Sequence, residues 1–484
     1  MFSAKLKPHG GIRPYSHKSL TRDIAIRPLA APRQLIVPLR QHTGPAAVPV
    51  VAPGAILSAG QLIAEARERM SAPVHGALAG VVTDVVSGDQ GYITIKVNAP
   101  ADQPSAPRLA APDGLDDAHA MLSLIEQAGI VGMGGAMFPA ADKIRMSLRY
   151  PIETLIVNGG ECEPYLTTDD RLMREQAEFI IGGIRYLQAI THARQVYIGI
   201  EDNKTEAIAR LDELCRQERN IEVVILPSLY PIGSAKQMIE AVTGRQIPQN
   251  RRSTEMGVLV QNVGTCIAIF HAIRFGKPVT HRVITVSGRA IEHPGNLLVP
   301  IGTPIKEIIG QCGGLKSQPA RIVLGGPMMG RAVEDLATPI NKGTSGLLLL
   351  NGDELPQTRP SACLRCGRCL DACPMSLAPQ AMFAELKNDG FAKARHQGLN
   401  ACLLCGSCAY VCPAALPLTQ FFDWGQQQLR LIKRQEDKLT RTRQNSARRQ
   451  ERLAREAAEK AAALAAKPAR RTRRNAPPTE DTPC

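Results

Sequence analysis

Two cysteine runs with the same spacing lie in the C-terminal third of this 484-residue chain. Residues 363–374 and 402–413 each read C-x2-C-x2-C-x3-C-P. In two-cluster ferredoxins such a run wraps three thiolates around one [4Fe-4S] cluster, and its fourth cysteine ligates the other cluster. One cluster is therefore assigned to Cys363, Cys366, Cys369 and Cys412, and the other to Cys402, Cys405, Cys408 and Cys373. The spacing predicts a ferredoxin-like domain over residues 361–425.

Zinc is the alternative metal that such cysteines could bind. Zinc sites favour paired Cys-x-x-Cys knuckles, and neither run contains a histidine, so we favour iron–sulfur clusters. The first ten residues lack the apolar segment of a secretory signal, and no stretch reaches the roughly 18 apolar residues of a membrane span. We therefore expect a reducing compartment, in which clustered cysteines indicate metal binding rather than disulfides.

The rest of the chain divides by its pattern of apolar residues. Residues 1–98 carry short strands broken by Pro and Gly and predict a small all-β domain. A Pro-rich linker over 98–114 follows. Residues 115–278 alternate strands and helices, as in an α/β domain with a parallel sheet, and residues 279–350 predict a small α+β module. Helices are expected at 116–129, 171–189, 204–217, 235–243 and 266–275.

Two segments of the α/β region have polar or glycine-rich loops. Residues 129–139 are glycine-rich, but the segment before them is helical, so the ordinary dinucleotide fingerprint does not apply. The glycines could still bring the backbone close to a phosphate or a flat ring, with Lys143 supplying charge, or they could simply cap a helix. Residues 158–165 follow a strand, where α/β sheets bind ligands, although a capped turn is the simpler alternative.

Taken in order, these motifs resemble the C subunit of the Rnf-type (also called Rsx) ion-translocating electron-transport complexes. The resemblance covers residues 1 to about 425 and is specific because it is a long ordered set. The matching segments are residues 7–12, 132–139, 158–164, 230–237, 261–265 and both cysteine runs.

The middle region is also similar to the flavin-bearing, NADH-binding subunit of respiratory complex I. This resemblance implies FMN as cofactor, NADH as substrate, and a set of cofactor-binding residues: Gly132, Gly134, Gly135, Phe138, Lys143, Asn158, Glu161, Glu163, Tyr230, Asn262 and Thr265. The chain departs from the complex I pattern at Met137 and Gly160, and Ser234 and Ala235 replace its acidic pair.

The resemblance further implies a lipoyl-like N-terminal β domain, a Rossmann-like flavin domain and a β-grasp module. The turn at 87–91 lacks the lysine of a carrier lipoyl domain, so that domain is expected to be structural. No catalytic side chain is expected, because the cofactors carry the chemistry. The implied function is electron transfer from NADH through FMN and two clusters to membrane partners, coupled to ion translocation. The implied location is peripheral, on the cytoplasmic face of the bacterial inner membrane, with integral and peripheral subunits, and ferredoxin, as candidate partners.

Two other functions stay open. One is a redox relay that shares this electron path but keeps an iron–sulfur regulatory sensor reduced. The other, suggested by the formal net charge of +14, is a nucleic-acid-binding iron–sulfur protein. Residues 428–484 hold 16 Lys or Arg and 7 Asp or Glu, so most of the excess charge lies in a basic tail. That tail has no aromatic residue to stack on bases, so no nucleic acid is expected, and a disordered or single-helix extension is predicted.

Overall fold

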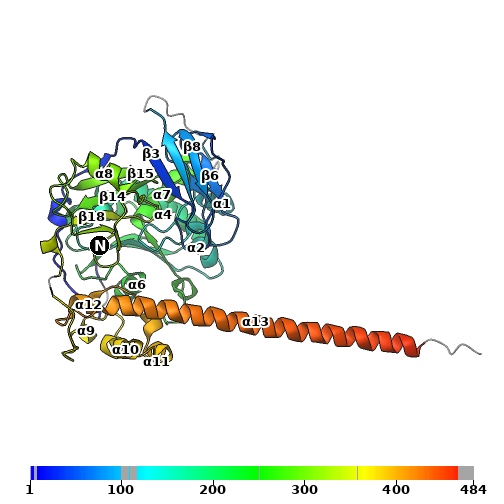
Figure 1. Ribbon diagram of the computed structural model, residues 1–484. Coiled ribbons are helices and arrows are strands. Elements are labelled where there is room, and N and C mark those ends of the chain that lie inside the picture. Colours follow the sequence, from blue (N-terminus) through cyan, green and yellow to red (C-terminus); the bar gives the residue numbers. More distant parts are fainter. Residues whose placement is uncertain are drawn as a thin grey trace, which may run out of the picture.

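The computed structural model describes residues 2–4, 8–99, 108–109, 117–249, 251–356 and 358–466. Lys7, nearly all of the predicted linker and the tail from residue 467 lie outside these residues. Figure 1 shows a compact body of three β-containing domains, a helical C-terminal domain beside it, and a long helix that runs away from both. The order of these parts along the chain is the one the sequence predicts.

A five-stranded parallel sheet forms the centre of the α/β domain, in the order β1-β12-β11-β10-β13. Side chains alternate between the two faces of its central strand β10, so each face is covered by helices. Leu155 and Val157 pack with the helices on one face, whereas Ile156 packs with α6 (Ala235–Thr243) on the other. The strands are β1 (Phe2–Ser3), β10 (Thr154–Gly159), β11 (Gln195–Glu201), β12 (Ile221–Leu226) and β13 (Val258–Asn262).

The helices of this domain mostly follow the predicted segments. They are α1 (Ala118–Gln127), α2 (Ala140–Ser147), α3 (Thr168–Glu175), α4 (Ala177–Thr191), α5 (Thr205–Cys215), α6 (Ala235–Thr243) and α7 (Val263–Phe275). The single helix predicted over 171–189 is wrong, because the chain leaves the helical conformation at Gln176 (φ −133°) and starts again as α4. Helix α2 was not predicted, since its eight residues are too short to show a clear apolar period.

The next module contains a six-stranded mixed sheet, ordered β17-β16-β18-β14-β15-β2. Strands β14 and β18, far apart in sequence, lie parallel and adjacent in its middle, and α8 (Ile305–Gln311) packs on the sheet. The strands are β2 (Ile26–Pro28), β14 (His281–Ser287), β15 (Gly295–Pro300), β16 (Arg321–Leu324), β17 (Arg331–Val333) and β18 (Gly346–Leu350).

A β-sandwich with its own apolar core forms the N-terminal domain. One sheet has the order β3-β9-β8-β5 and the other β4-β6-β7. The predicted turn at 87–91 joins β8 to β9 as a hairpin. The strands are β3 (Gln34–Pro38), β4 (Val48–Pro49), β5 (Ile56–Leu57), β6 (Leu62–Glu65), β7 (Val74–His75), β8 (Gly80–Val86) and β9 (Tyr92–Val97).

Two described strands that precede this sandwich pair with other sheets. Strand β1 pairs with β12 of the α/β sheet, and β2 pairs with β15 of the mixed sheet. The N-terminal segment therefore ties two later domains together before the sandwich begins at β3.

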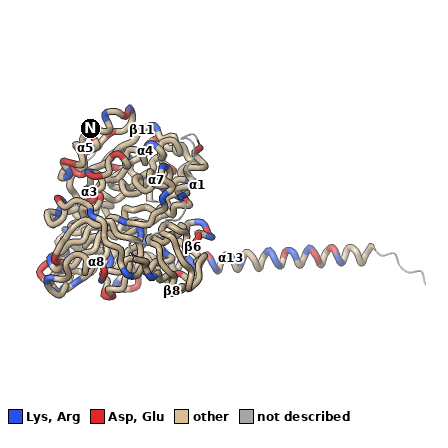
Figure 2. Tube along the Cα trace, turned by 90° about the horizontal axis from the view of Figure 1, so that it is seen from above, with Lys and Arg blue, Asp and Glu red and all other residues tan. Residues whose placement is uncertain are grey.

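The C-terminal domain is built from short helices around the cysteine runs, packed on the first turns of α13. Helix α13 then continues as one exposed helix with mixed charges, well beyond the body (Figure 2). The helices are α9 (Arg368–Asp371), α10 (Pro379–Leu386), α11 (Phe391–His396), α12 (Ser407–Tyr410) and α13 (Leu418–Ala465). No helix among the described residues has the length and apolar character needed to cross a membrane.

Candidate functional site

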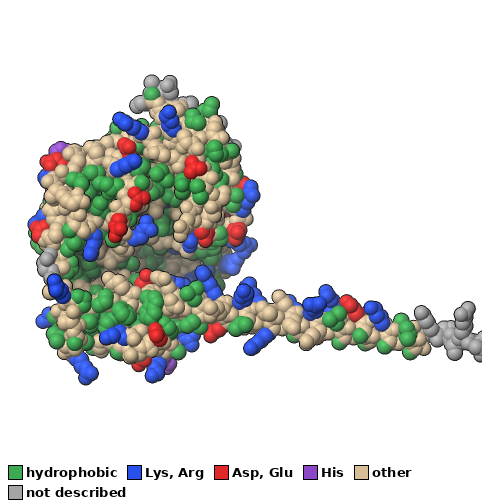
Figure 3. Space-filling model, viewed as in Figure 1, with side chains coloured by type: hydrophobic (Ala, Val, Ile, Leu, Met, Phe, Trp, Pro, Cys, Tyr) green, Lys and Arg blue, Asp and Glu red, His purple; other side chains and the backbone are tan. Residues whose placement is uncertain are grey.

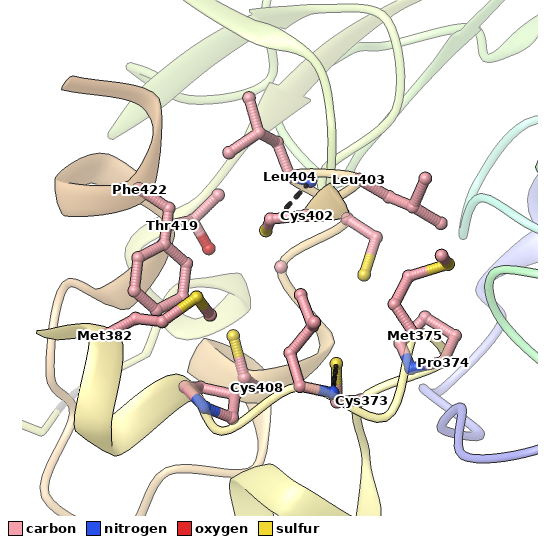
Figure 4. A pocket seen from close by; sticks show the side chains of 14 residues that line it. Cys373, Pro374, Met375, Met382, Cys402, Leu403, Leu404, Cys408, Thr419 and Phe422 are labelled. Carbon is pink, nitrogen blue, oxygen red and sulfur yellow. Dashed lines mark hydrogen bonds between the residues drawn. The ribbon is translucent and has the colours of Figure 1, made fainter. Parts of the chain in front are cut away.

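Four cysteines from both runs line one cavity in the C-terminal domain. They are Cys402, Cys405 and Cys408 of the second run and Cys373, the last cysteine of the first run. Figure 4 shows the sulfurs of Cys373, Cys402 and Cys408 facing a common space. This is the set that the interleaved assignment predicts for one of the two clusters.

The cavity suits an iron–sulfur cluster. Its walls include the apolar side chains of Met382, Leu404 and Phe422, which exclude water. Backbone N–H groups point at the sulfurs: Leu377 donates to Cys373 Sγ at 3.4 Å and Leu404 to Cys402 Sγ at 3.5 Å. Such hydrogen bonds to sulfur are among the features that set cluster potentials.

Burial opposes ionisation of these thiols when no metal is bound. It raises the pKa of Cys402 to about 11, and it raises the pKa of Cys408 further still. Coordination to iron reverses this effect, because a coordinating thiol is deprotonated outright. The cysteines of this site are therefore expected to be thiols without a cluster and thiolates when a cluster is bound.

The other three cysteines of the first run lie at the surface. Cys363 and Cys366 are exposed and Cys369 is half-buried. Burial raises the pKa of Cys369, and the nearby Cys363 and Cys366 raise it further. Cys412, their predicted fourth partner, follows α12, and α12 packs against α9 of the first run.

The α/β domain lies directly on the loops that carry the buried cysteines. The hydroxyl of Tyr230, a fully buried residue, donates a hydrogen bond of 2.6 Å to the backbone carbonyl of Cys405. Gln237 Nε2 at the start of α6 donates to the carbonyl of Pro374 at 2.9 Å. The N-terminal segment fills the remaining space, since a side chain at Gly10 (φ +62°) would meet the carbonyl oxygen of Cys373 at 2.5 Å.

The glycine loop folds back on itself and meets the start of α7. Gly132 N donates to the carbonyl of Phe138 at 2.8 Å, which closes the loop. Met133 N donates to Thr265 Oγ1 at 3.0 Å, and a Cβ on Gly134 would lie 3.4 Å from Cβ of Asn262. Gly135 has φ +102° and open space around it, so its backbone is accessible to a ligand. The loop therefore fits the close approach of a phosphate or flat ring.

Lys143 lies on α2, just after this loop. Its ammonium donates to the carbonyl of Val260, in the middle of β13. Burial lowers its pKa to about 8, and Cys266 opposes that shift. A desolvated ammonium gains from a nearby anion, so this half-buried lysine is a candidate partner for a bound phosphate.

The polar loop after β10 is held by internal hydrogen bonds. Asn158 Nδ2 donates to the carbonyl of Gly233 at 2.8 Å, and Asn158 Oδ1 accepts from Gly160 N at 2.9 Å. A Cβ on Gly160 would lie 2.9 Å from Cε of Met238, so the aspartate of the complex I pattern would require the Met238 side chain to move. Asn262 Nδ2 in turn donates to Asp169 Oδ2 at 2.7 Å, while Asn262 Oδ1 caps α7 through Gly264 N at 2.9 Å.

The two glutamates of this loop bind backbone groups of neighbouring elements. Glu161 accepts from Asp169 N at 2.8 Å at the start of α3. Glu163 accepts from Met328 N at 3.0 Å and Met329 N at 2.9 Å, in the loop between β16 and β17. Burial raises the pKa of each carboxyl to about 7.

Sequence reasoning missed Lys18, which holds the same loop from the other side. Its buried ammonium donates to the carbonyls of Glu161 (2.8 Å), Glu163 (2.9 Å) and Leu166. Burial lowers the pKa of Lys18. More than 140 residues separate the partners, and no local pattern around Lys18 could have indicated this contact.

Four family models match successive parts of the chain. They are the RnfC barrel sandwich hybrid domain (residues 6–92), the Nuo51 FMN-binding domain (125–271), the SLBB domain (283–332) and the 4Fe-4S dicluster domain (359–416). The C subunit of the ion-translocating oxidoreductase complex of Rhodobacter capsulatus is 41% identical, with 87% of this chain and 82% of that protein aligned. The chain belongs to the RnfC family, the C subunits of ion-translocating oxidoreductase complexes.

Another relative is the C subunit of the proton-translocating ferredoxin:NAD(+) oxidoreductase complex of Clostridium ljungdahlii. It is 38% identical, with 80% of this chain and 86% of that protein aligned. A crystal structure of an NAD+-reducing [NiFe]-hydrogenase gives a TM-score of 0.46 and 19% identity, covering 58% of this chain and 55% of that one. A likeness at that level bears on neither fold nor function.

Membership of the RnfC family confirms the predicted fold class and order of domains. This chain is an electron-transfer subunit of an ion-translocating, multi-subunit oxidoreductase complex. Its cofactors are FMN and two [4Fe-4S] clusters.

Proposed function

We propose that this chain oxidises NADH at FMN in the α/β domain and sends the electrons first to the buried cluster and then to the exposed one. FMN accepts two electrons as a hydride and can release them singly to centres such as [4Fe-4S] clusters. The observation that carries this order is the contact of Tyr230 and Gln237 with the loops of Cys405 and Cys373. The buried cysteines face the flavin domain, whereas Cys363 and Cys366 face solvent.

The protein's part is to hold FMN at the glycine loop. Gly134 and Gly135 present backbone, and the first turn of α7 after Asn262 presents N–H groups and the positive end of its dipole. Lys143 would supply the charge that a phosphate requires. In our proposal, Asn158, Glu161 and Glu163 shape the pocket by fixing the loop after β10 rather than by contacting the flavin.

Ser234 lies in the tightly packed turn between Tyr230 and α6. Gly233 in this turn approaches Gly160 so closely that neither can carry a side chain without displacing its neighbours. Ser234 and Ala235 stand where the complex I pattern has an acidic pair. We propose that NADH is recognised at this position by backbone groups and by the shape of the packed turn, not by carboxylates.

The location follows from the complex to which the family belongs. We propose that the chain sits peripherally on the cytoplasmic face of the bacterial inner membrane, held by integral and peripheral subunits, with ferredoxin as a further electron partner. Ion translocation would then be a property of the assembly, driven by the electrons that this chain delivers.

The experiment is a cofactor and reduction assay on purified, anaerobically prepared protein. We expect bound flavin and about eight iron atoms per chain, as two [4Fe-4S] clusters require. NADH should bleach the flavin and then produce the electron paramagnetic resonance signals of reduced clusters. The variant Lys143→Met should lose flavin but keep iron, whereas Lys277→Met, at an exposed lysine, should keep both. Protein with full flavin and iron that NADH cannot reduce would overturn the proposal.

A further inference from the structure

The two cysteine runs share their spacing but differ in the residues between the ligands. The first run has Arg365 and Arg368 where the second has Leu404 and Ser407. Ser407 is fully buried and Leu404 packs into the core of the C-terminal domain. Arg365 and Arg368 are exposed. At these two positions the second run therefore has inward-packed side chains, whereas the first run has exposed cationic ones.

The two arginines carry charge that nearby carboxylates do not neutralise. No carboxylate among the described parts of the chain forms a salt bridge with either of them. The only acidic residue within the run is Asp371, and it too is exposed. An exposed arginine that is not neutralised within its own chain is available for a carboxylate of another molecule.

Large apolar side chains accompany these arginines at the surface. Leu364, between Cys363 and Arg365, is 66% exposed, and Leu370 is 38% exposed. Tyr410, two residues before Cys412, is 54% exposed. Tyrosine, arginine and apolar anchors are the residues that dominate the energetics of protein interfaces. Lys and Arg side chains also stand out along the outer edge of the C-terminal domain (Figure 3).

We propose that the surface formed by Leu364, Arg365, Arg368, Leu370 and Tyr410, called here the outer cluster face, docks an acidic redox protein of the same complex. This inference rests on the proposed function. One electron leaves the reduced outer cluster and reduces a one-electron centre in the docked protein, so that the cluster is oxidised by one electron and no proton moves. The arginines would pair with carboxylates on the partner, and Leu364 would enter an apolar contact at its centre.

An acidic protein fits this face better than an anionic lipid surface. Electron transfer requires that an acceptor centre come close to the cluster, and lipids carry none. The apolar residues also lie on a short loop and a four-residue helix, which offer no extended amphipathic surface for insertion into a membrane. Charge complementarity at such a face mainly accelerates association and orients the partner.

The test uses holo protein and, as the probe, the remaining complex purified from a strain that lacks this chain. We expect Arg365→Glu combined with Arg368→Glu to weaken binding at low ionic strength by at least tenfold and to reduce the salt dependence of binding. Arg149→Glu combined with Arg194→Glu, two exposed arginines of the α/β domain, is the matched control and should bind normally. Equal binding of both double variants and the native chain would overturn the proposal.

Further measurements separate the possible causes of failure. Iron content and reduction of the isolated chain by NADH report on the proposed function without any partner, and both should be unchanged in Arg365→Glu/Arg368→Glu. If that variant does not retain its clusters, Leu364→Ser tests the same face without changing charge and should also weaken binding. Sedimentation with vesicles containing anionic lipid completes the test: if only vesicle binding falls, the face contacts a membrane and the proposed acidic partner is wrong.

Discussion

The hydroxyl of Tyr230 donates a hydrogen bond of 2.6 Å to the backbone carbonyl of Cys405, and this contact joins the α/β domain to the loop of the buried cluster. Tyr230 is buried, and its backbone also pairs with Ile12 of the N-terminal segment. Burial raises the pKa of this phenol, so it remains a hydrogen-bond donor across the physiological range. One residue therefore links three segments of the chain next to a cluster ligand.

Replacing Tyr230 by phenylalanine should weaken this junction. The carbonyl of Cys405 would be left buried without its donor, which costs about 1–3 kcal/mol, and the unfolding midpoint should fall by a few degrees. Without the phenol O–H, the negative end of the Cys405 carbonyl dipole is no longer compensated. The added negative potential should make the buried cluster harder to reduce. Tyr165→Phe is the control, because its hydroxyl donates to Glu354 at 2.8 Å, away from the cysteines. An unchanged cluster potential in Tyr230→Phe would contradict this role.

The interleaved ligand assignment can be tested with pairs of cysteine variants. Cys373→Ser with Cys402→Ser removes two ligands from the same predicted cluster, so about four iron atoms per chain should remain. Cys402→Ser with Cys412→Ser removes one ligand from each, and both clusters should be impaired. If instead each run holds its own cluster, the two pairs will exchange results. Iron and sulfide analysis with electron paramagnetic resonance decides between them.

Flavin affinity should depend on pH through Lys143. The ammonium form pairs with a phosphate, and burial lowers the pKa of this lysine to about 8 in the chain without ligand. Affinity for FMN should therefore be nearly constant up to about pH 7, fall about twofold by pH 8, and fall at higher pH by up to about tenfold per unit for a single linked proton. Isothermal titration of Lys143→Met should show weak binding with no such fall. A similar fall in that variant would assign the effect to another group.

Lys342 lies where three domains meet and should make stability depend on pH. Its buried ammonium donates to the carbonyls of Pro73 and Gly129, each at 2.7 Å, and burial lowers its pKa to about 7. Between pH 7 and about 10 the unfolded chain binds a proton at this lysine that the folded chain does not, so this group makes stability rise with pH. The native chain should gain up to about 1.4 kcal/mol per pH unit relative to Lys342→Met.

Thermal unfolding of both proteins at several pH values measures this difference. Lys316→Met, at an exposed lysine, serves as the control and should follow the native curve. A constant difference between the native protein and Lys342→Met across that range would show that Lys342 stays protonated in the fold.

Local sequence pattern predicted the α/β alternation well, because buried strands and amphipathic helices carry their own periods. It could not show that α3 and α4 are separate, since the break at Gln176 leaves the apolar spacing of both helices intact. It also predicted a flavin contact for Glu163, but it could not indicate that this carboxylate accepts hydrogen bonds from Met328 and Met329, more than 160 residues away. Such partners become visible only when distant segments are brought together.

By itself, the sequence determined the family, the order of domains and the existence of two clusters, because thiolate ligands at fixed spacing leave few other coordination chemistries. Only the tertiary structure decided which cysteines are buried against the flavin domain and which face solvent. Two runs of identical spacing are equivalent as local motifs. Their difference arises from packing, since Tyr230, Gln237 and Gly10 cover the loops of Cys373 and Cys405, whereas Cys363 and Cys366 are left exposed.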